Sequence, residues 1–200
     1  MYKSVYYLSM RLREFRQTMK MPIFYTYQVE RLFGNESKNL INTQLSRMVK
    51  RGDLVRLKRG VYRLAEAEVD ELVLASWLYK PSYVSLESVL QMSGVIPEVV
   101  GKVTSVTTVT SKEVKTGEEG VFLYSKIAKE LFFGYEKVKD EKSGLYYNLA
   151  EPEKALLDWI YIRRVKSLEG ERVDMSELNK KKLRSYAKIY PKWVRKVIDE

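Results

Sequence analysis

The chain has 200 residues, 45% of them hydrophobic and 31% charged, with a formal net charge of +10 at pH 7. It contains no cysteine, which excludes disulfides and thiolate chemistry, and no histidine, which excludes zinc–histidine sites, Ser-His-Asp triads and Cys-His pairs. No apolar run is long enough to cross a bilayer and no signal peptide is recognisable, so we expect a cytoplasmic globular protein without a membrane partner.

The positive charge is concentrated in the first third of the chain. Residues 1–66 carry 14 Lys and Arg against 5 Asp and Glu, residues 67–150 carry 9 against 12, and residues 151–200 carry 13 against 9. A basic block at one end is typical of a dedicated nucleic-acid module, whereas evenly spread charge indicates only solubility. We therefore predict two domains, residues 1–66 and residues 67–200, with the boundary where the sign of the charge changes.

The first domain is predicted to contain three helices and a hairpin. Ser37 is a typical N-cap, Gly52 is a typical helix stop, and Arg59-Gly60 is a turn between two alternating segments. In chain order the elements are a basic amphipathic helix 4–20, a helix Thr26–Phe33, a helix Lys38–Arg51, and strands Leu54–Lys58 and Val61–Leu64. This order is that of a winged helix-turn-helix.

The second domain is predicted to be a mixed α+β domain with a small sheet and C-terminal helices. Ser85 is expected to cap its second helix, and Pro152 stands in the first turn of a later one. The expected helices are Val69–Tyr79, Leu86–Met92, 151–164, 176–189 and 191–198, and the expected strands are 103–110, 121–127, 131–135 and 145–149. The whole chain is therefore assigned to the α+β class.

The third helix has two chemically distinct faces. Ile41, Leu45, Met48 and Val49 recur at helical spacing and predict a buried face. The opposite face is polar and carries no acid, and Asn, Arg, Thr and Ser are side chains that contact base edges in the major groove of DNA. The predicted base-reading residues are Asn39, Asn42, Thr43, Ser46 and Arg47. A basic face that is merely solvated is the alternative.

The hairpin is predicted to form the wing. Val55 and Leu57 alternate with Arg56 and Lys58, which places apolar and cationic side chains on opposite sides of the first strand. Cations without acids at a hairpin tip suit phosphate contacts, which supply affinity but no sequence information. The predicted phosphate-binding residues are Lys50, Arg51, Arg56, Lys58, Arg59 and Arg63. A basic edge strand that only discourages aggregation is the alternative.

Three segments together resemble the AbiEi family of antitoxins from type IV toxin–antitoxin systems. They are GDLVRLKRGVYRL at 52–64, YVSLESVLQMSGVIPE with VTSVTTVT at 83–110, and YYNLAEPEKALLDWIYIRR at 146–164. Their order matches the family, and the resemblance covers about residues 22–165. It implies a winged-helix regulator that represses its own promoter, followed by an antitoxin or effector domain. A nucleotidyltransferase-like toxin of the same system is the second partner it implies.

The segment 151–164 also carries a charged cluster. Lys154 and Asp158 are four residues apart on a helix and can pair, so an ion pair on the surface of a core helix is our main prediction. The functional alternative is that Glu153, Lys154 and Asp158 form a contact site for a partner.

Two other functions stay open beside the repressor. An enzyme acting on nucleic acid needs clustered carboxylates for Mg²⁺, and the acids at Glu151, Glu153 and Asp158 lack a second acidic motif. A protein-binding module is favoured by the 15 tyrosines. We predict no catalytic residue, metal or cofactor. Candidate dimer interfaces are the helix 4–20 and the C-terminal helices, whose cations between Lys180 and Lys188 form either a solvated face or a second DNA contact.

Overall fold

The chain, here as a computed structural model that describes residues 12–97 and 101–199, divides into two compact units, residues 1–68 and 69–200. Both helices and strands are present in each unit, which confirms the predicted α+β class. Part of the predicted first helix, residues 4–11, lies outside the described residues. No helix of the described chain is long and apolar enough to span a membrane.

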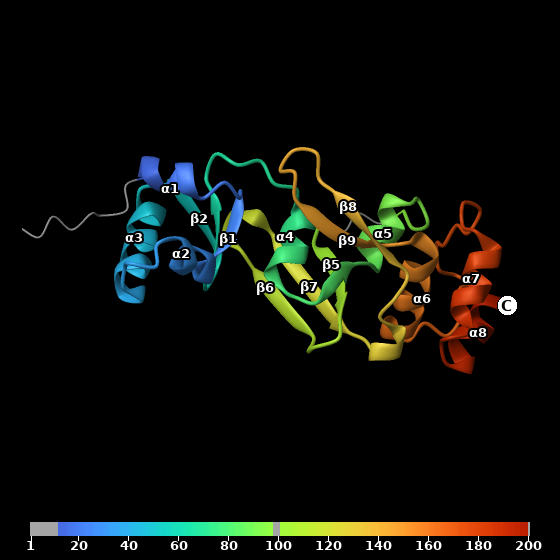
Figure 1. Cartoon of the computed structure of the whole chain (residues 1–200). Helices are drawn as coiled ribbons and strands as arrows, with labels where there is room; N and C mark the ends of the chain where they lie inside the picture. Colours follow the sequence, from blue (N-terminus) through green and yellow to red (C-terminus); the bar gives the residue numbers. More distant parts are fainter. Residues whose placement is uncertain (1–11, 98–100, 200) are drawn as a thin grey trace, which may run out of the picture. The chain divides into compact units, whose positions relative to one another are not determined.

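In its described part, from residue 12 on, the N-terminal unit contains three helices and a three-stranded antiparallel sheet of order β1-β3-β2 (Figure 1). Its elements are α1 (Leu12–Thr18), β1 (Ile23–Tyr25), α2 (Thr26–Leu32), α3 (Lys38–Lys50), β2 (Leu54–Lys58) and β3 (Val61–Leu64). The predicted hairpin has the predicted bounds. Strand β1 was not predicted, because its partner β3 follows it at a distance in the sequence that no local pattern reveals.

One hydrophobic core holds this unit together. Phe15 of α1 meets Phe24 of β1 edge to face at 5.3 Å, and Phe24 stacks on Tyr62 of β3 at 6.0 Å. Ile41 and Leu45 complete the core from α3, and neither is exposed to solvent. The buried apolar residues of α3 therefore pack into the core, and its polar residues lie on the opposite side of the helix.

The C-terminal unit contains a six-stranded mixed sheet of order β6-β7-β5-β4-β9-β8. Strand pairs β4–β9 and β5–β7 are parallel, and the remaining pairs are antiparallel. The strands are β4 (Ser82–Val84), β5 (Val103–Thr107), β6 (Lys112–Lys115), β7 (Val121–Lys126), β8 (Tyr135–Lys139) and β9 (Tyr146–Ala150). The helices are α4 (Glu71–Leu78), α5 (Glu87–Met92), α6 (Pro152–Arg163), α7 (Lys180–Ala187) and α8 (Lys192–Asp199), with 3₁₀ turns η1 (Gly117–Glu119) and η2 (Lys129–Leu131).

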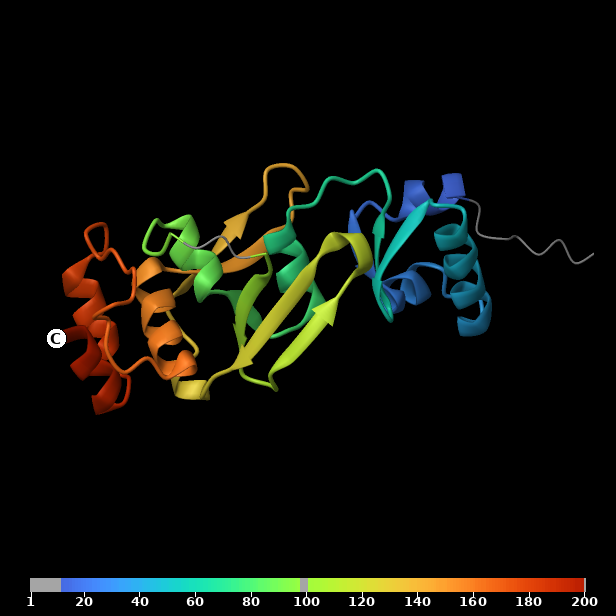
Figure 2. The same cartoon turned by 180° about the vertical axis from the view of Figure 1, so that it is seen from behind.

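The helices of this unit form two groups. Helix α4 packs on β4, β5 and β9, while α6 contacts α5, α7 and α8. Figures 1 and 2 show α6, α7 and α8 side by side at the C-terminal end of the unit. Residues 179–199 are thus held to the rest of the unit through α6, with further ring contacts from Tyr186 and Tyr190 to Phe133.

Several predictions for this unit are wrong in detail. The strand predicted at 131–135 is wrong except for Tyr135, because Gly134 has a φ of +68° and breaks the extended chain before β8 begins at Tyr135. Helix α7 begins at Lys180 rather than 176, where the Asn179 side chain accepts hydrogen bonds from Lys181 N and Lys182 N. Strands β4 and β6 were missed because one is only three residues long and the other, KEVK, is a charged edge strand.

Ser85 is not the cap of α5, as we had predicted. The N-cap is Leu86, whose φ of 60° is unusual for a residue other than glycine. The hydroxyl of Ser85 instead donates to Asp158 Oδ2 at 2.9 Å. Ser85, in the turn between β4 and α5, therefore contacts α6, as described below, and does not cap α5.

Candidate functional site

Helix α3 presents one buried and one exposed face, as the sequence predicts. Ile41, Leu45 and Met48 are fully buried, whereas Val49 is half-buried and Gln44 takes a further buried position. The helix begins at Ser37, whose hydroxyl accepts from Leu40 N at 3.3 Å. Lys38 is exposed at the start of the helix, and further along it the exposed residues are Asn39, Asn42, Thr43, Ser46, Arg47 and Lys50. All five predicted base-reading residues therefore lie on the solvent side of one helix.

These exposed residues line a common surface feature. An open depression of about 350 Å³ lies over α3 and is bordered by five side chains, Asn42, Thr43, Ser46, Arg47 and Lys50. Thr43 Oγ1 donates to the carbonyl of Asn39 at 2.8 Å, so its hydroxyl proton is used within the helix. The other four side chains offer one amide, one hydroxyl and two cationic groups to solvent. Together they form a surface with hydrogen-bond donors and acceptors and no negative charge.

The hairpin of β2 and β3 is tied to the start of α2. The turn residue Gly60 has a φ of +78°, which favours glycine, and its carbonyl accepts from Thr26 N at 3.0 Å. A register irregularity lies between Arg56 and Lys58. The strict alternation that we predicted for β2 is therefore wrong, and Leu54 and Leu57 are the buried residues of this strand.

The predicted phosphate-binding cations differ in availability. Arg56 and Arg59 are exposed, and Lys58 is half-buried. Arg51 is exposed but its Nε lies 2.8 Å from Asp53 Oδ2, which offsets part of its charge. Arg63 is half-buried, and its Nη1 donates to the carbonyls of Leu64, Ala65 and Ala67 at 2.9–3.3 Å. Its guanidinium thus binds the backbone that leaves β3.

The second predicted cluster, on α6, is inside the protein. Lys154 and Asp158 have no exposed surface and Glu153 is 5% exposed, so the predicted surface ion pair is wrong. In this conformation the three side chains also face the chain's own residues and offer nothing to a partner. Glu153 Oε1 accepts from Asn179 N at 2.8 Å, which fixes the start of α7 on α6.

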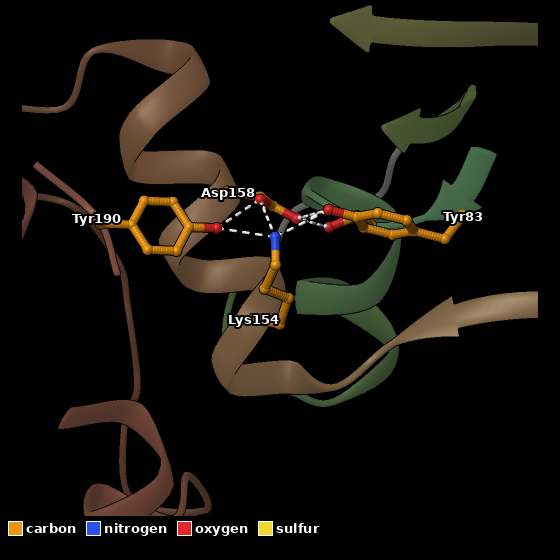
Figure 3. A network of polar contacts seen from close by, with 5 residues as sticks. Tyr83, Lys154, Asp158 and Tyr190 are labelled. Atoms are coloured by element: carbon orange, nitrogen blue, oxygen red, sulfur yellow. Dashed lines mark hydrogen bonds and ion pairs between the residues drawn. The ribbon is translucent and has the colours of Figure 1, made fainter. Parts of the chain in front are cut away.

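Lys154 and Asp158 form a closed polar network with two tyrosines and a serine from other elements (Figure 3). The Lys154 ammonium donates to Asp158 Oδ1 and, at 2.8 Å each, to the hydroxyls of Tyr83 and Tyr190. Tyr190 in turn donates to Asp158 Oδ1 at 2.7 Å, while Tyr83 and Ser85 each donate to Asp158 Oδ2 at 2.9 Å. All three ammonium protons and both carboxylate oxygens are therefore satisfied.

Aromatic rings complete the surroundings of the ammonium. Its nitrogen lies 5.2 Å from the ring centre of Tyr83, 5.1 Å from that of Phe133 and 5.4 Å from that of Tyr190. Gly134 is required beside the lysine stem, because an added Cβ would lie 3.0 Å from Lys154 Cγ. The network thus joins β4, α6 and the segment between α7 and α8 through a single buried charge pair.

Burial disfavours the charged forms of Lys154, Tyr83 and Tyr190. It lowers the pKa of Lys154, an effect that Asp158 opposes, and burial with the charge of Asp158 raises the pKa of Tyr83 and Tyr190 well above the usual range. No group of three or more acids in the described residues is placed to hold a metal ion. The arrangement has the geometry of a structural junction, since no member is open to a substrate.

Sequence reasoning missed three members of this junction. Tyr83, Ser85 and Tyr190 stand 71, 73 and 32 to 36 residues from their partners on α6. The signal that was present is the helix itself: Lys154 and Asp158 lie in a segment whose other residues, from Ala155 to Ile160, are apolar on every side. A helix that is apolar all round is buried, and so are its charges.

Comparison with known proteins supports the resemblance for the N-terminal unit. Residues 10–65 match the family model described as "Transcriptional regulator, AbiEi antitoxin". No curated protein matches the chain. The matched segment ends within the N-terminal unit, so the similarities of 83–110 and 146–164 lie outside it. The resemblance to the AbiEi antitoxins is thus confirmed for residues 10–65, which are similar to the transcriptional regulators of that family.

Proposed function

We propose that the chain is a sequence-specific repressor that binds double-stranded DNA at its own promoter as an autoregulating antitoxin. The observation that carries the proposal is the exposed face of α3, where six polar or cationic side chains and no acid lie opposite the buried Ile41, Leu45 and Met48. Such a face fits the major groove, where amide and guanidinium groups read adenine and guanine edges. The family match supports the regulatory role.

In this proposal the side chains divide into two tasks. Asn39, Asn42, Thr43, Ser46 and Arg47 contact bases, and Lys50, Arg51, Arg56, Lys58 and Arg59 contact phosphates. Arg63 supports the fold of the wing, because three backbone carbonyls already bind its guanidinium. The division follows from position, since the first group lies along one helix face and the second lies at its end and on the hairpin.

The test is a fluorescence-anisotropy titration of the full chain with the DNA upstream of its own gene and with a shuffled duplex, at two salt concentrations. Arg47→Ala is expected to weaken binding to the upstream DNA by about 1–3 kcal/mol and to reduce the preference over shuffled DNA. Arg59→Ala is expected to weaken both equally and to lower the salt slope by about 1. Equal binding of both duplexes by the unmodified chain contradicts sequence-specific recognition.

A matched control uses an arginine of the other unit. Arg172 is exposed in the C-terminal unit, so Arg172→Ala removes the same charge without touching the proposed interface. Binding by this variant is expected to stay unchanged at both salt concentrations. A loss equal to that of Arg47→Ala would show that overall charge, and not the α3 face, determines the affinity.

We assign the antitoxin or effector role to the C-terminal unit, residues 69–200, with a nucleotidyltransferase-like toxin of the same system as its functional counterpart. The support is that this unit has its own sheet and core and lies outside the matched regulator segment. Co-expression with the toxin tests the assignment. Arg47→Ala is expected to lose promoter repression while still restoring growth, and loss of both activities together contradicts a division of labour.

A further inference from the structure

Helices α7 and α8 and the turn between them carry a long run of positive charge. Residues 178–198 contain eight Lys and Arg and no Asp or Glu. Of these cations, Lys182 pairs with Glu151 at 3.2 Å, and Arg195 is half-buried. The other six are exposed and form no ion pair with a described residue; they are Lys180, Lys181, Arg184, Lys188, Lys192 and Lys196. We call these six residues the α7–α8 basic face.

The six cations lie on the solvent side of the two helices. In α7, Leu183 and Ala187 are buried, and the four exposed cations fall within an arc of about 100° outside this buried stripe. In α8 the two exposed lysines lie opposite the buried Val194 and Val197. Both helices pack on α6 and on each other (Figure 1). The cations therefore project away from these packing contacts.

Helix stability does not account for this grouping of charge. Lys180 and Lys181 stand in the first turn of α7, where the positive end of the helix dipole disfavours cations. Like charges at i,i+4, as in Lys180 with Arg184 and Arg184 with Lys188, also repel one another. The grouping thus costs folding free energy, which favours a role in binding a polyanion.

The chemistry of the face fits phosphates better than the surface of a partner protein. Protein interfaces have an apolar core and are depleted in lysine. In the described part of residues 178–198, Ile189 is the one exposed large hydrophobic side chain, at 51%. Five of the six cations are lysines, which bind phosphates as compact point charges. The face therefore offers charge for a phosphate backbone and little apolar area for a protein.

The face also lacks side chains that read bases. The one amide side chain in residues 178–198, Asn179, accepts from Lys181 N and Lys182 N at 3.1 Å each and so caps α7. Phosphate contacts add the same free energy to every DNA sequence, so they would not help a repressor to choose its operator. Two helices side by side are about 20 Å wide, and the B-form major groove is about 12 Å wide. The pair thus lies across phosphate rows and does not insert into a groove.

We propose that the α7–α8 basic face binds double-stranded RNA through its phosphates, without sequence preference. RNA duplexes are recognised in the manner that this face allows, by the shape of the A-form helix and by contacts to its backbone. The face lies wholly within the C-terminal unit and uses neither α3 nor the wing. The proposal therefore does not rest on the proposed repressor function.

Fluorescence anisotropy of the full chain tests the proposal, with a labelled RNA duplex of about 20 base pairs and a DNA duplex of the same sequence. The variant that combines Lys181→Gln, Arg184→Gln and Lys188→Gln is expected to weaken RNA binding by about tenfold or more. The slope of log affinity against log salt is expected to fall by about 2–3, because each lost phosphate contact contributes about 0.9. Binding to the DNA duplex is expected to be unchanged.

The matched control removes three charges from other parts of the same unit. Lys126→Gln, Lys129→Gln and Arg172→Gln change the net charge equally and alter exposed side chains outside α7 and α8. RNA affinity is expected to be unchanged in this control, and circular dichroism is expected to show an intact fold in both triple variants. Arg47→Ala is expected to retain RNA binding, so the repressor proposal and this one fail independently.

Four results overturn the proposal. The first is no binding of the RNA duplex by the unmodified chain. The second is unchanged RNA affinity in the α7–α8 triple variant, which places the RNA elsewhere, for example on the cationic wing. The third is an equal loss of RNA and DNA affinity in that variant, which identifies the face as a second DNA contact. The fourth is displacement of the RNA by poly-L-glutamate at equal charge concentration, which indicates an acidic protein as the partner.

Discussion

Helices α3 and α6 both carry clusters of polar and charged side chains, but the clusters differ in exposure and in pairing. On α3 the side chains of Asn42, Ser46 and Arg47 are exposed to solvent, and no acid accompanies them. On α6, Lys154 and Asp158 are fully buried, and each polar atom has a partner. An exposed unpaired surface is available for binding, whereas a buried paired network holds elements together.

The difference predicts how each cluster responds to substitution. Removing one member of a buried pair leaves the other charged and desolvated, which is costly in folding free energy. Removing an exposed side chain costs folding little but takes away a contact with a ligand. The predictions below test this contrast, from the largest expected effect to the smallest.

Asp158→Ala is expected to lower the free energy of unfolding by about 3–5 kcal/mol, because Lys154 then remains buried without its counter-charge. Urea unfolding of the full chain, monitored by tryptophan fluorescence, measures the loss. The control is Lys154→Met combined with Asp158→Leu, which removes both charges and is expected to cost less than the single change. A single-variant loss below about 1 kcal/mol would show that the pair is not buried as described.

Ser46→Glu is expected to weaken binding to upstream DNA by more than about tenfold, because a carboxylate then faces phosphates and base acceptors. Its unfolding free energy is expected to stay within about 0.5 kcal/mol of the unmodified chain, since Ser46 is exposed. Anisotropy and urea unfolding measure the two quantities. Ser185→Glu, on an exposed position of α7, is the control and is expected to leave both unchanged. Unaltered DNA binding in Ser46→Glu would remove α3 from the interface.

The contrast between the helices also explains what the sequence reveals. In the N-terminal unit the bounds of β2 and β3 and the start of α3 follow from local signals, such as the Ser37 cap and the Gly60 turn. Strand β1 could not be predicted because it has only three residues, Ile23 to Tyr25. It is a strand because it pairs with residues 61–63 of β3, which are distant in the sequence. The exposed face of α3 was predictable because helical periodicity alone separates it from the core.

The α6 junction was only half predictable. The spacing of Lys154 and Asp158 indicates a pair, but an i,i+4 pair has the same spacing on the surface and in the interior. Its burial depends on Tyr83 and Tyr190, which the fold brings from distant parts of the chain. The periodicity of the sequence predicts the helix, but the tertiary structure determines which of its charged side chains are buried.

Tyr186→Phe tests the intermediate case, a partly buried contact between α7 and the residue before α6. The Tyr186 hydroxyl donates to Glu151 Oε2 at 2.6 Å, and this hydrogen bond, together with burial, raises the pKa of Tyr186 to about 12. A raised pKa means that the folded state keeps the proton longer than the unfolded state. The stabilisation is therefore complete below pH 10 and is lost as pH rises from about 10 to about 12.

The phenylalanine variant is accordingly expected to lose about 1 kcal/mol of stability at neutral pH and to show a weaker decline between pH 10 and 12. Unfolding in urea across this pH range provides the measurement. Tyr27→Phe is the control, because Tyr27 is 62% exposed and has no hydrogen bond to a carboxylate among the described residues. If Tyr186→Phe and the unmodified chain decline in parallel, the contact with Glu151 does not control alkaline stability.

Glu87→Gln is expected to have the smallest effect on the free energy of unfolding, although Glu87 and Arg163 form a two-contact ion pair. Arg163 Nε and Nη2 contact the two carboxylate oxygens of Glu87 at 2.6 and 3.0 Å, but both side chains are partly exposed. Water screens such a pair, so the expected loss of unfolding free energy is about 0.2–1 kcal/mol, and added salt is expected to reduce it further. A double-mutant cycle with Arg163→Gln isolates the coupling between the two charges.

The Glu87–Arg163 pair links α5 to α6, and the Lys154–Asp158 pair lies within α6. The two pairs differ mainly in burial. A loss of about 3 kcal/mol in Glu87→Gln would therefore mean that burial does not set the energetic ranking of charged contacts on α6.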